Sequence, residues 1–455
     1  MDLSTRQRIH LVGIGGAGMS AIATVLQTMG HVVSGSDLKA SRTLERLEAA
    51  GVRVAVGHDP SHLEDATALA ISSAVPQTNV EVAEAVRRGL PVLSRADLLS
   101  SIAGLRRTIA VAGTHGKTTT SSMLALVLVE AGLHPSFIIG GDVNDIGTNA
   151  VWDEGEWLVV EADESDGTFL RLAPELAVVT SLEADHLEHY GSFSDLKLAF
   201  ERFVAESSAA LVYGDGQEAA SLLEVAPEGS ASFGTGEANR FRLGAVESGR
   251  NDVRFSLRDG SEDLGRFELA VPGEHNALNA AAAVATARLA GASAEDCRRA
   301  LARFAGVARR YEFRGQRNGV TFVDDYAHLP GEVEATLRAA REGGFNRIVA
   351  VFQPHRYSRT QALASSFRDA FVGADVVVVT SVYAAGEAAR PGVSGQLVVD
   401  AVHAAHPEAA ISYVPDHEGL LAYLRETLRE GDLCLSLEAG DLAGLPDELL
   451  GDDRW

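Results

Sequence analysis

Short β-branched runs alternate with helix-like stretches along most of this 455-residue sequence. The alternation is typical of βαβ units, in which helices join parallel strands and cover the faces of the sheet. The first strands that we expect are Arg8–Val12, Val52–Val56, Ala68–Ser72 and Pro91–Ser94. The sequence therefore predicts an α/β fold built on parallel sheets.

The length and the rhythm of this alternation indicate three domains. A domain usually contains about 100–200 residues, so a chain of 455 residues corresponds to about three domains. The pattern starts again near residues 107 and 308, and we expect domains at residues 1–107, 108–308 and 309–455. Between residues 208 and 270 the strands become short and polar with glycine turns. This change predicts some antiparallel sheet in the middle domain.

The composition excludes several classes of protein. Lys and Arg number 39 against 63 Asp and Glu, and the net charge of −24 disfavours a broad basic face for nucleic acid or anionic lipid. Cys297 and Cys434 are the only cysteines, so neither a disulfide framework nor a cysteine metal site is expected. We find no signal-peptide pattern and no apolar run long enough for a spanning helix. We expect a cytoplasmic protein without membrane insertion, either monomeric or dimeric.

The segment Gly13–Gly18 fits the pattern G-x-G-x-x-G and lies directly between an expected strand and an expected helix. Glycines at these positions allow a tight turn and let the backbone approach a pyrophosphate at the helix N-terminus. Asp37 follows at the end of a further expected strand, Val32–Ser36, where a carboxylate can accept hydrogen bonds from a ribose. The segment is interpreted as a nucleotide diphosphate site, and a purely structural glycine turn is the alternative.

A second glycine loop, Gly113–Thr119, joins a buried strand to a helix and reads Gly-Thr-His-Gly-Lys-Thr-Thr. It combines a glycine-rich backbone, one ammonium and an adjacent hydroxyl, which are the groups that wrap a polyphosphate and bind Mg²⁺. Two residues separate the glycines, whereas a P-loop usually has four. Lys117 is one of only three lysines in the chain, so its place in this loop favours a shortened P-loop over a structural turn.

Carboxylates follow two further strands of the middle block. The acidic segment Glu161–Asp166 comes after an apolar strand, and Asp185-His186 comes after another. Open α/β sheets bind ligands at the carboxyl ends of their strands, and a hard cation such as Mg²⁺ takes oxygen ligands there. The alternative is a solvated acidic turn in a chain that is acidic throughout.

The last block carries two polar motifs, Asp324–His328 and His355–Arg359, each directly after an expected strand. A guanidinium binds a carboxylate through two parallel hydrogen bonds, so Arg356 and Arg359 suit a small substrate that bears a carboxylate. Surface salt bridges are the alternative role for both arginines. A dehydrogenase would explain the first glycine loop and leave Lys117 unexplained, whereas an ATPase would explain only the second loop.

Taken together, the motifs resemble those of the Mur ligases, and specifically of the members that add the first amino acid in peptidoglycan synthesis. The resemblance extends over nearly the whole chain in the order of the family. The motifs that carry it are Gly13–Ser20, Gly113–Thr120, Glu161–Asp166, Glu183–His186 with Tyr190-Gly191, His275–Ala280, Arg309–Glu312, Asp324–His328 and Phe352–Thr360.

The resemblance implies three domains: a Rossmann-like N-terminal domain for a UDP-sugar, a central P-loop ATPase domain with a mixed sheet, and a Rossmann-like C-terminal domain for ATP and the amino acid. It also implies an activity. The family member would use ATP and Mg²⁺ to join L-alanine to the lactyl carboxylate of UDP-N-acetylmuramate through an acyl phosphate. The alternatives are a related ligase that adds a peptide or another amino acid, an NAD-dependent oxidoreductase, and a nucleotide-sensing protein without turnover.

The resemblance further implies roles for individual residues, with Lys117, His328 and Arg356 as catalytic. The implied ATP contacts are Gly113, Thr114, His115, Gly116, Lys117, Thr118, Thr119, Asn276, Asn279, Arg310 and Asp325. The implied UDP-sugar contacts are Gly15, Gly16, Ala17, Gly18, Asp37 and Ser72. The implied amino-acid contacts are Tyr326, His328, Arg356 and Arg359, and the implied Mg²⁺ ligands are Thr118, Glu161 and His186.

The sequence departs from the family pattern at two positions. The usual DDYxHHP motif has Leu329 in place of its second histidine, and the usual GAGD motif near the C-terminus has Glu438 in place of its first glycine. Any role of the missing histidine is therefore absent or moved, and the function of the loop Glu438–Asp441 stays open.

Overall fold

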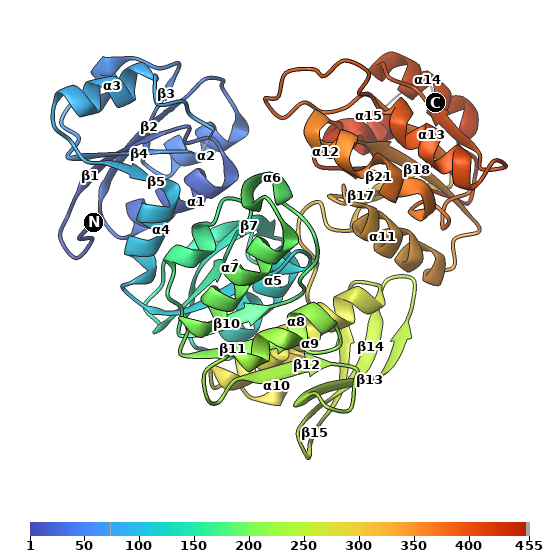
Figure 1. The fold of residues 1–455 in the computed structure, drawn as a ribbon, viewed down its shortest axis with the longest axis horizontal. Helices are drawn as coiled ribbons and strands as arrows, with labels where there is room; N and C mark the ends of the chain where they lie inside the picture. The colour runs from blue at the N-terminus through green and yellow to red at the C-terminus, as the bar shows by residue number, and fades with distance from the viewer. Residues whose placement is uncertain (73, 452–455) are drawn as a thin grey trace. The chain divides into compact units, whose positions relative to one another are not determined.

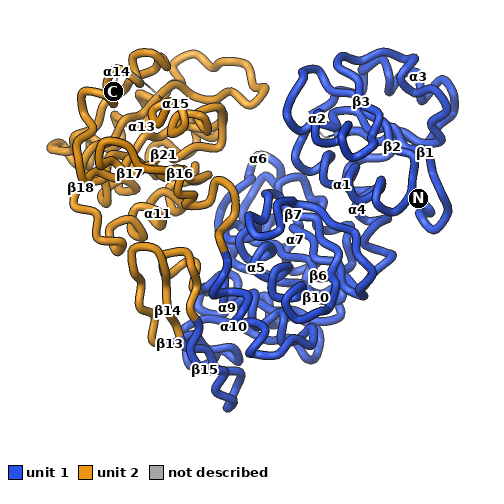
Figure 2. The backbone as a smooth tube through the Cα atoms, turned by 180° about the vertical axis from the view of Figure 1, so that it is seen from behind, with its two compact units in different colours: residues 1–244, 256–267, 278–304 blue, residues 245–255, 268–277, 305–455 orange. Residues whose placement is uncertain are grey.

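A computed structural model describes residues 1–72 and 74–451. The protein has a three-domain α/β architecture with three sheets, as the sequence predicts (Figure 1). The chain forms two compact units (Figure 2). Unit 1 comprises residues 1–244, 256–267 and 278–304, and unit 2 comprises residues 245–255, 268–277 and 305–455. Within the described residues, none of the helices combines the length and the apolar character that a membrane span requires.

The first sheet has five parallel strands in the order β3-β2-β1-β4-β5. Its strands are β1 (Arg8–Val12), β2 (Val32–Asp37), β3 (Arg53–Val56), β4 (Ala68–Ile71) and β5 (Val92–Ser94). Its helices are α1 (Ala17–Thr28), α2 (Arg42–Ala49), α3 (Val80–Arg87) and α4 (Arg95–Ala103). The strand order reverses between β1 and β4, and such a switch point opens a crevice at the carboxyl ends of the strands.

The second sheet has ten strands in the order β15-β14-β13-β12-β11-β10-β6-β9-β7-β8. Its strands are β6 (Arg107–Ala112), β7 (Ser136–Val143), β8 (Thr148–Val151), β9 (Trp157–Glu161), β10 (Leu176–Val179), β11 (Ala209–Tyr213), β12 (Ala231–Gly234), β13 (Phe241–Ser248), β14 (Val253–Asp259) and β15 (Glu262–Leu269). The helices of this part are α5 (Lys117–Glu130), α6 (Leu187–Tyr190), α7 (Phe193–Ala205), α8 (Gln217–Ser221), α9 (Glu274–Leu289) and α10 (Ala294–Ala302).

This second sheet is mixed. The strands β11, β12 and β13 pair in parallel, whereas β7 and β8 pair antiparallel. Only Gly260 and Ser261 lie between β14 and β15, which are neighbours in the sheet. A two-residue connection can join antiparallel strands only, so the antiparallel sheet expected between residues 208 and 270 is present at β14 and β15.

The third sheet has six strands in the order β16-β17-β21-β18-β19-β20, and all pairs except β16–β17 are parallel. Its strands are β16 (Glu312–Arg317), β17 (Val320–Asp325), β18 (Arg347–Gln353), β19 (Val376–Val379), β20 (Ile411–Tyr413) and β21 (Asp432–Glu438). Its helices are α11 (Pro330–Glu342), α12 (Tyr357–Leu363), α13 (Gln396–Ala405), α14 (His417–Thr427) and α15 (Leu445–Gly451).

Burial of the central elements explains how each sheet positions a loop. Helix α5 is buried almost from end to end, so the loop before it is anchored on both sides by apolar packing. Strand β21 is buried at every residue and lies between β17 and β18. The carboxyl ends of these three strands therefore bring together residues that lie more than one hundred positions apart in the sequence.

Candidate active site

The first glycine loop lies at the switch point of the first sheet, between β1 and α1. Gly13 has a φ of +77°, which favours glycine, and the Gly13 and Ile14 amides donate to the carbonyl oxygen of Ser36 at 2.8 and 3.1 Å. The Gly15 amide donates to the Asp37 carboxylate at 2.9 Å. A Cβ atom on Gly13 would lie 3.0 Å from Ser72 Cβ. The structure therefore brings the predicted residues Asp37 and Ser72 to the loop.

The geometry of this loop suits an anionic group. Gly16 is the N-cap residue of helix α1 and has an extended backbone. A glycine has no side chain that could accept hydrogen bonds, so Gly16 leaves the first-turn amides of the helix without a side-chain cap. The predicted residues Ala17 and Gly18 belong to this first turn. Asp37 is already engaged by the Gly15 amide, so it also holds the loop in its turn.

Sequence reasoning missed one residue beside this loop. Arg95, the first residue of α4, places a guanidinium nitrogen 2.9 Å from where a Cβ of Gly18 would lie. The same guanidinium forms ion pairs with Asp166 at 3.1 Å and Asp163 at 3.6 Å. Arg95 thus lies between the first glycine loop and the acidic segment of the middle block. It lies far from both motifs in the sequence, and no local pattern marks it.

The second glycine loop connects β6 to α5 and depends on both of its glycines. Gly113 has a φ of +131° and Gly116 a φ of +81°. A Cβ atom would overlap Thr180 Oγ1 at Gly113 and Asn279 Oδ1 at Gly116. Asn279 therefore packs directly against the loop, as the resemblance implies for a residue of the ATP site.

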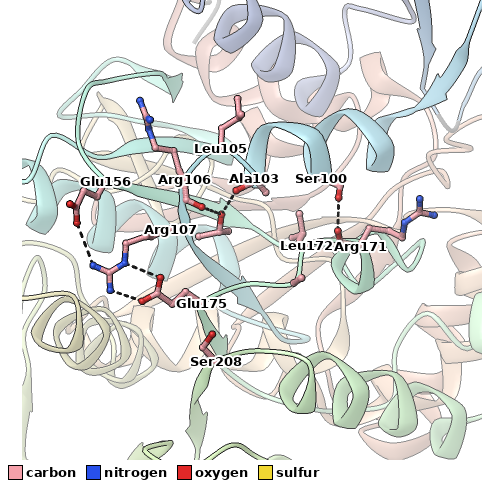
Figure 3. Close-up of a pocket in the computed structure, with 13 residues that line it drawn as sticks. Ser100, Ala103, Leu105, Arg106, Arg107, Glu156, Arg171, Leu172, Glu175 and Ser208 are labelled. Atoms are coloured by element: carbon pink, nitrogen blue, oxygen red, sulfur yellow. Dashed lines mark hydrogen bonds and ion pairs between the residues drawn. The ribbon is translucent and has the colours of Figure 1, made fainter. Parts of the chain in front are cut away.

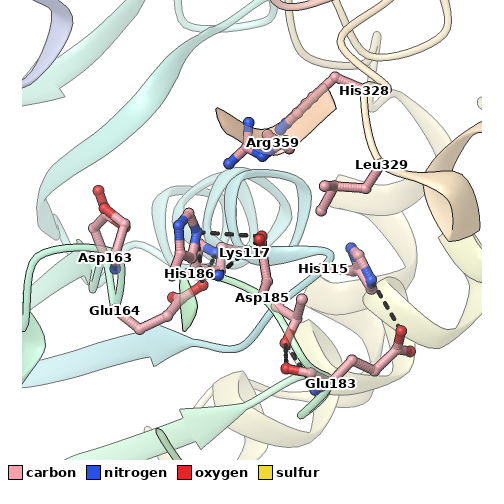
Figure 4. Close-up of polar contacts among 12 residues, drawn as sticks. His115, Lys117, Asp163, Glu164, Glu183, Asp185, His186, His328, Leu329 and Arg359 are labelled. Carbon is pink, nitrogen blue, oxygen red and sulfur yellow. Dashed lines mark hydrogen bonds and ion pairs between the residues drawn. The ribbon is translucent and has the colours of Figure 1, made fainter. Parts of the chain in front are cut away.

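Lys117 begins helix α5 and points back into the loop. Its Nζ donates to the Gly113 carbonyl oxygen and to Glu164 Oε1, each at 2.7 Å (Figure 4). Burial disfavours the ammonium, but the nearby carboxylates of Glu164 and Asp163 outweigh it and raise the pKa of Lys117. Burial also disfavours the charged form of Glu164 and therefore raises its pKa, although Lys117 opposes this shift. The loop therefore holds a buried, fixed positive charge.

The neighbouring hydroxyl of Thr118 donates to Glu161 Oε1 at 2.9 Å, and the Gly140 amide donates to Glu161 Oε2 at 2.7 Å. His186 has a left-handed backbone with a φ of +53°, and its Nε2 lies 3.3 Å from Asp185 Oδ2. The same nitrogen lies 4.0 Å from Glu164 Oε1. Thr118 and Glu161 are thus hydrogen-bonded to each other. His186 lies near Glu164, whose carboxylate binds Lys117.

The rest of the loop is anchored to the segment that follows β10. The His115 amide donates to Ser181 Oγ at 2.8 Å, and the Glu183 amide donates to Thr114 Oγ1 at 2.9 Å. His115 Nε2 lies 3.4 Å from Glu183 Oε2 (Figure 4). These contacts fix the loop against the segment that follows β10. The predicted residue Thr119 is buried in the first turn of α5.

Three predicted ATP contacts of unit 2 make contacts within their own unit. Asp325 is buried and accepts hydrogen bonds from the Tyr311 and Ala327 amides at 2.7 and 2.8 Å. Burial raises the pKa of this carboxyl group. Asn276 donates to the Pro272 carbonyl oxygen at 2.7 Å. Arg310 places its guanidinium carbon 4.9 Å from the centre of the Tyr326 ring.

Two of the predicted amino-acid residues, Tyr326 and His328, belong to a row of rings in unit 2. The Tyr326 ring meets His328 edge-on at 5.6 Å, and His328 meets His355 at 5.5 Å. Arg359 Nη1 lies 3.0 Å from His355 Nδ1. Tyr383, which sequence reasoning missed, stacks on His355 at 5.7 Å. The row assembles from loops after β17, β18 and β19, so only the sheet order reveals Tyr383.

The two histidines of this row are held in their neutral forms. Burial lowers the pKa of His328, and burial, together with electrostatic interactions with His328 and Arg359, lowers the pKa of His355 to about 3. A neutral imidazole keeps a lone pair that can accept a proton or a hydrogen bond. The predicted residue Arg356 has a left-handed backbone with a φ of +67°, and its amide donates to the Tyr383 carbonyl oxygen at 2.8 Å.

The departure at Leu329 lies at the start of helix α11. Leu329 is buried at the N-terminus of α11, where its amide donates to Glu332 Oε2 at 3.1 Å. The His328 amide donates to the same oxygen at 3.0 Å. Glu332 thus caps the helix through the backbone amides of His328 and Leu329, and nothing in these contacts explains a leucine in place of the histidine.

A pocket of about 710 Å³ lies elsewhere in unit 1 (Figure 3). The residues that line it include the start of β6 and those just before β9, β10 and β11. The pocket therefore opens at the amino ends of these strands, away from the second glycine loop. Within its lining, Arg107 binds Glu175 through two hydrogen bonds and also pairs with Glu156. The predicted site residues do not line this pocket.

Comparison with known protein families decides the family. The chain matches the model of the Mur ligase family catalytic domain over residues 8–107, of the Mur ligase middle domain over 111–287, and of the Mur ligase glutamate ligase domain over 309–437. The chain belongs to the Mur ligase family. The first glycine loop of this Mur ligase lies in the first matched region, the second loop in the middle region, and the row of rings in the last.

Several known proteins resemble this Mur ligase over nearly its whole length. It is 44% identical to the "UDP-N-acetylmuramate--L-alanine ligase" of Anaeromyxobacter sp. strain Fw109-5, covering 98% of this chain and 97% of that protein. It is also 44% identical to the protein of the same name from Rubrobacter xylanophilus, covering 97% and 99%. The crystal structure of UDP-N-acetylmuramate-alanine ligase MurC from Thermotoga maritima has a TM-score of 0.83 at 28% identity and covers 98% of both chains.

Proposed function

We propose that the protein is an ATP-dependent carboxylate–amine ligase of peptidoglycan synthesis, which joins L-alanine to the lactyl carboxylate of UDP-N-acetylmuramate. The observation that carries the proposal is the buried Lys117 ammonium, fixed at the head of α5 beside a glycine loop that suits a polyphosphate. The substrates are those in the names of relatives that are 44% identical over nearly the full chain. Use of ATP and a nucleotide sugar supports a cytoplasmic location.

We assign the substrates to three domains, residues 1–107, 108–308 and 309–455. The first glycine loop and Asp37 would bind the UDP-sugar in the first domain. The loop Gly113–Thr119 would bind ATP in the second, with Asn279 packed against it. The row of rings at the carboxyl edge of the third sheet, together with Arg356 and Arg359, would bind the amino acid.

The residues around Thr118 fit a Mg²⁺ ion that accompanies ATP. A hydroxyl and a carboxylate lie within 2.9 Å of each other at the phosphate loop, and Mg²⁺ prefers such oxygens together with phosphate oxygens and water. In residues 1–72 and 74–451, no group of three or more His, Cys, Asp or Glu is arranged as a metal site. Thr118, Glu161 and His186 are the residues that would hold the Mg²⁺ ion, and it would neutralise phosphate charge.

The chain's own groups account for the first half of the reaction. A carboxylate accepts an amine poorly, because oxide is a poor leaving group. Transfer of the γ-phosphoryl group of ATP to a lactyl carboxylate oxygen releases ADP and makes an acyl phosphate. Both reactants are anions, so the reaction needs fixed positive charge where they meet. Lys117 supplies one such charge, and the loop amides add oriented donors.

The second half of the reaction needs a proton acceptor. The amine of L-alanine attacks the acyl carbon, the bond from that carbon to the phosphate oxygen breaks, and inorganic phosphate leaves. The nitrogen loses a proton in this step. His328 is the candidate acceptor, because burial keeps its imidazole neutral and Tyr326 and His355 hold its ring.

One assay tests the proposed function. The protein is incubated with ATP, Mg²⁺ and UDP-N-acetylmuramate, together with L-alanine, glycine, L-serine or a tripeptide, and phosphate release is followed. We expect release that requires both the sugar nucleotide and L-alanine. Release that prefers the tripeptide would identify a related ligase instead. A change of nicotinamide absorbance without ATP would replace the proposal with an oxidoreductase.

A further inference from the structure

Glu438 occupies the end of the central strand β21, where the family pattern has a glycine, and it is 0% exposed. Its carboxylate is used on both sides. Oε1 binds Arg309 Nη2, and Oε2 accepts a hydrogen bond from the Gly440 amide at 2.5 Å. The Glu438 carbonyl oxygen accepts a further bond from Arg309 Nη2 at 3.2 Å. A buried carboxylate thus clamps one guanidinium to the carboxyl edge of the third sheet.

Arg309 in turn supports Tyr326. The guanidinium carbon of Arg309 lies 4.9 Å from the centre of the Tyr326 ring, and the Arg309 carbonyl oxygen accepts the Tyr326 amide at 2.8 Å. A guanidinium that faces an aromatic ring attracts it. Tyr326 then contacts His328 edge-on at 5.6 Å. Glu438 is therefore linked through Arg309 to the first two rings of the proposed amino-acid site.

A competing carboxylate makes Glu438 necessary for this arrangement. Asp324 is also 0% exposed, and its Oδ2 lies 3.7 Å from Arg309 Nε, beyond hydrogen-bond distance. That oxygen has no hydrogen-bond partner among the described residues. Without the Glu438 carboxylate, Asp324 becomes the strongest remaining partner for the guanidinium. Arg309 would then turn towards Asp324 and leave its place at the Tyr326 ring.

We infer that Glu438 is a positioning residue of the amino-acid site, which acts through Arg309 on the Tyr326 ring. The inference rests on the proposed function, because it assigns Tyr326 to the binding of L-alanine. Glu438 itself touches no substrate in this scheme. It replaces the flexibility of a glycine by a fixed ion pair behind the site.

The first experiment reads the placement of the ring directly. Protein with ¹³C-labelled tyrosine rings is compared by NMR with Glu438→Gln and Arg309→Met, and Tyr326→Phe assigns the resonance. We expect the Tyr326 signal to shift in both variants. The matched control is Asp432→Asn, because Asp432 is a 3% exposed carboxylate at the other end of β21 that pairs with Arg347 at 2.6 Å. A Tyr326 signal that does not move in Glu438→Gln overturns the inference.

The second experiment measures the consequence for catalysis. We expect Glu438→Gln to raise KM for L-alanine about 10-fold or more, because small misplacements of binding groups are costly, while KM for ATP stays within about 2-fold. Glu438→Asp should recover part of the loss, and Glu438→Gln with Arg309→Met should be no worse than Arg309→Met alone. Equal changes in both constants, or the same change in Asp432→Asn, contradict positioning.

The two experiments separate this inference from the proposed function. If the unaltered protein shows no phosphate release that depends on L-alanine, the proposed function fails and the assignment of Tyr326 to L-alanine fails with it. If that release is present and Glu438→Gln leaves KM for L-alanine unchanged, only the role of Glu438 is wrong.

Discussion

Lys117 shows how a single residue can determine both stability and chemistry. Its side chain is 15% exposed, and its partner Glu164 is 2% exposed. A buried ion pair loses hydration of both charges, so it stabilises the protein only while both partners are present. The same ammonium is the fixed positive charge that the proposed phosphoryl transfer needs. Glu164 therefore pairs with the Lys117 ammonium in the fold, whereas the proposed function of that ammonium is to neutralise phosphate charge.

The first prediction concerns this pair. Lys117→Met should abolish the release of phosphate that depends on L-alanine, and it should lower Tm because Glu164 stays buried without its cation. Adding Glu164→Gln removes the stranded charge and should recover most of the lost Tm without restoring activity. Thermal unfolding and the phosphate assay check both points. Near-normal turnover in Lys117→Met would show that the loop is not a phosphate site.

The second prediction concerns pH and the buried Asp324. Burial and the nearby charge of Glu438 raise the pKa of Asp324 to about 7 in the folded protein, above its usual value of 3.8. The folded state thus holds a proton that the unfolded state releases above about pH 4, and the stabilisation from this proton is lost as the pH rises towards 7.

Asp324→Asn removes that titration. Relative to the unaltered protein, the urea midpoint of Asp324→Asn should rise between pH 5 and pH 8. The change of this difference with pH is the informative quantity, because groups that do not interact with Asp324 contribute equally in both proteins. A difference that is independent of pH over this range would mean that Asp324 is already ionised at pH 5.

At the next scale, the loop and helix that form the phosphate site act as one element. Gly116 caps α5 with a left-handed backbone, and Asn279 of helix α9 packs where a side chain would otherwise be. Helix α5 is buried along its length, so the loop cannot relax by moving the helix. A glycine is required there by conformation and by space together.

The third prediction tests this element. Gly116→Ala should raise KM for ATP and lower stability by about 1–3 kcal/mol, because it adds both backbone strain and an overlap with Asn279. Adding Asn279→Ala should relieve the overlap and recover part of the stability. Gly132→Ala is the matched control, since Gly132 follows the other end of α5 with a φ of +69° and open space around it. It should lower stability and leave KM for ATP unchanged.

For the whole molecule, the first sheet and strands β6 to β12 of the second sheet belong to one compact unit, and a continuous core extends through residues of both sheets. Ion pairs between the two parts include Arg95 with Asp166 at 3.1 Å and Arg171 with Asp97 at 2.7 Å. Arg95 lies beside the first glycine loop, and Asp166 belongs to the same acidic segment as Glu164, the partner of Lys117. One side chain therefore connects the proposed UDP-sugar loop to the surroundings of the proposed ATP loop.

The fourth prediction concerns that connection. Arg95→Met should raise KM for UDP-N-acetylmuramate by about 10-fold, because it removes a guanidinium beside an anion-binding helix N-terminus. KM for ATP should rise less. Arg171→Met breaks the other, more exposed pair and should leave both constants near their original values. Steady-state kinetics with each substrate varied in turn measures both variants, and equal effects of the two substitutions would contradict a specific role for Arg95.

Local patterns along the sequence already indicate the α/β class, the first strands within one or two residues, and both glycine loops. These features depend on backbone conformation and on alternation within short windows, so neighbouring residues suffice to predict them. The order of the strands is different, because it depends on which distant segments pair. Strand β21 lies between β17 and β18 although it comes last in the sequence, and only this order brings Glu438 to Arg309 and Tyr326.

The same distinction holds for the site. Short sequence motifs already indicate the chemical roles of four residues, which are Lys117, Thr118, Asp37 and Arg359. No motif predicts the roles of Arg95, Tyr383 and Glu438, because these roles arise from contacts between residues that are 28 to 129 positions apart in the sequence. Only folding brings such residues together. Local sequence therefore specifies which groups can do the chemistry, whereas long-range packing of three sheets specifies how each group is held.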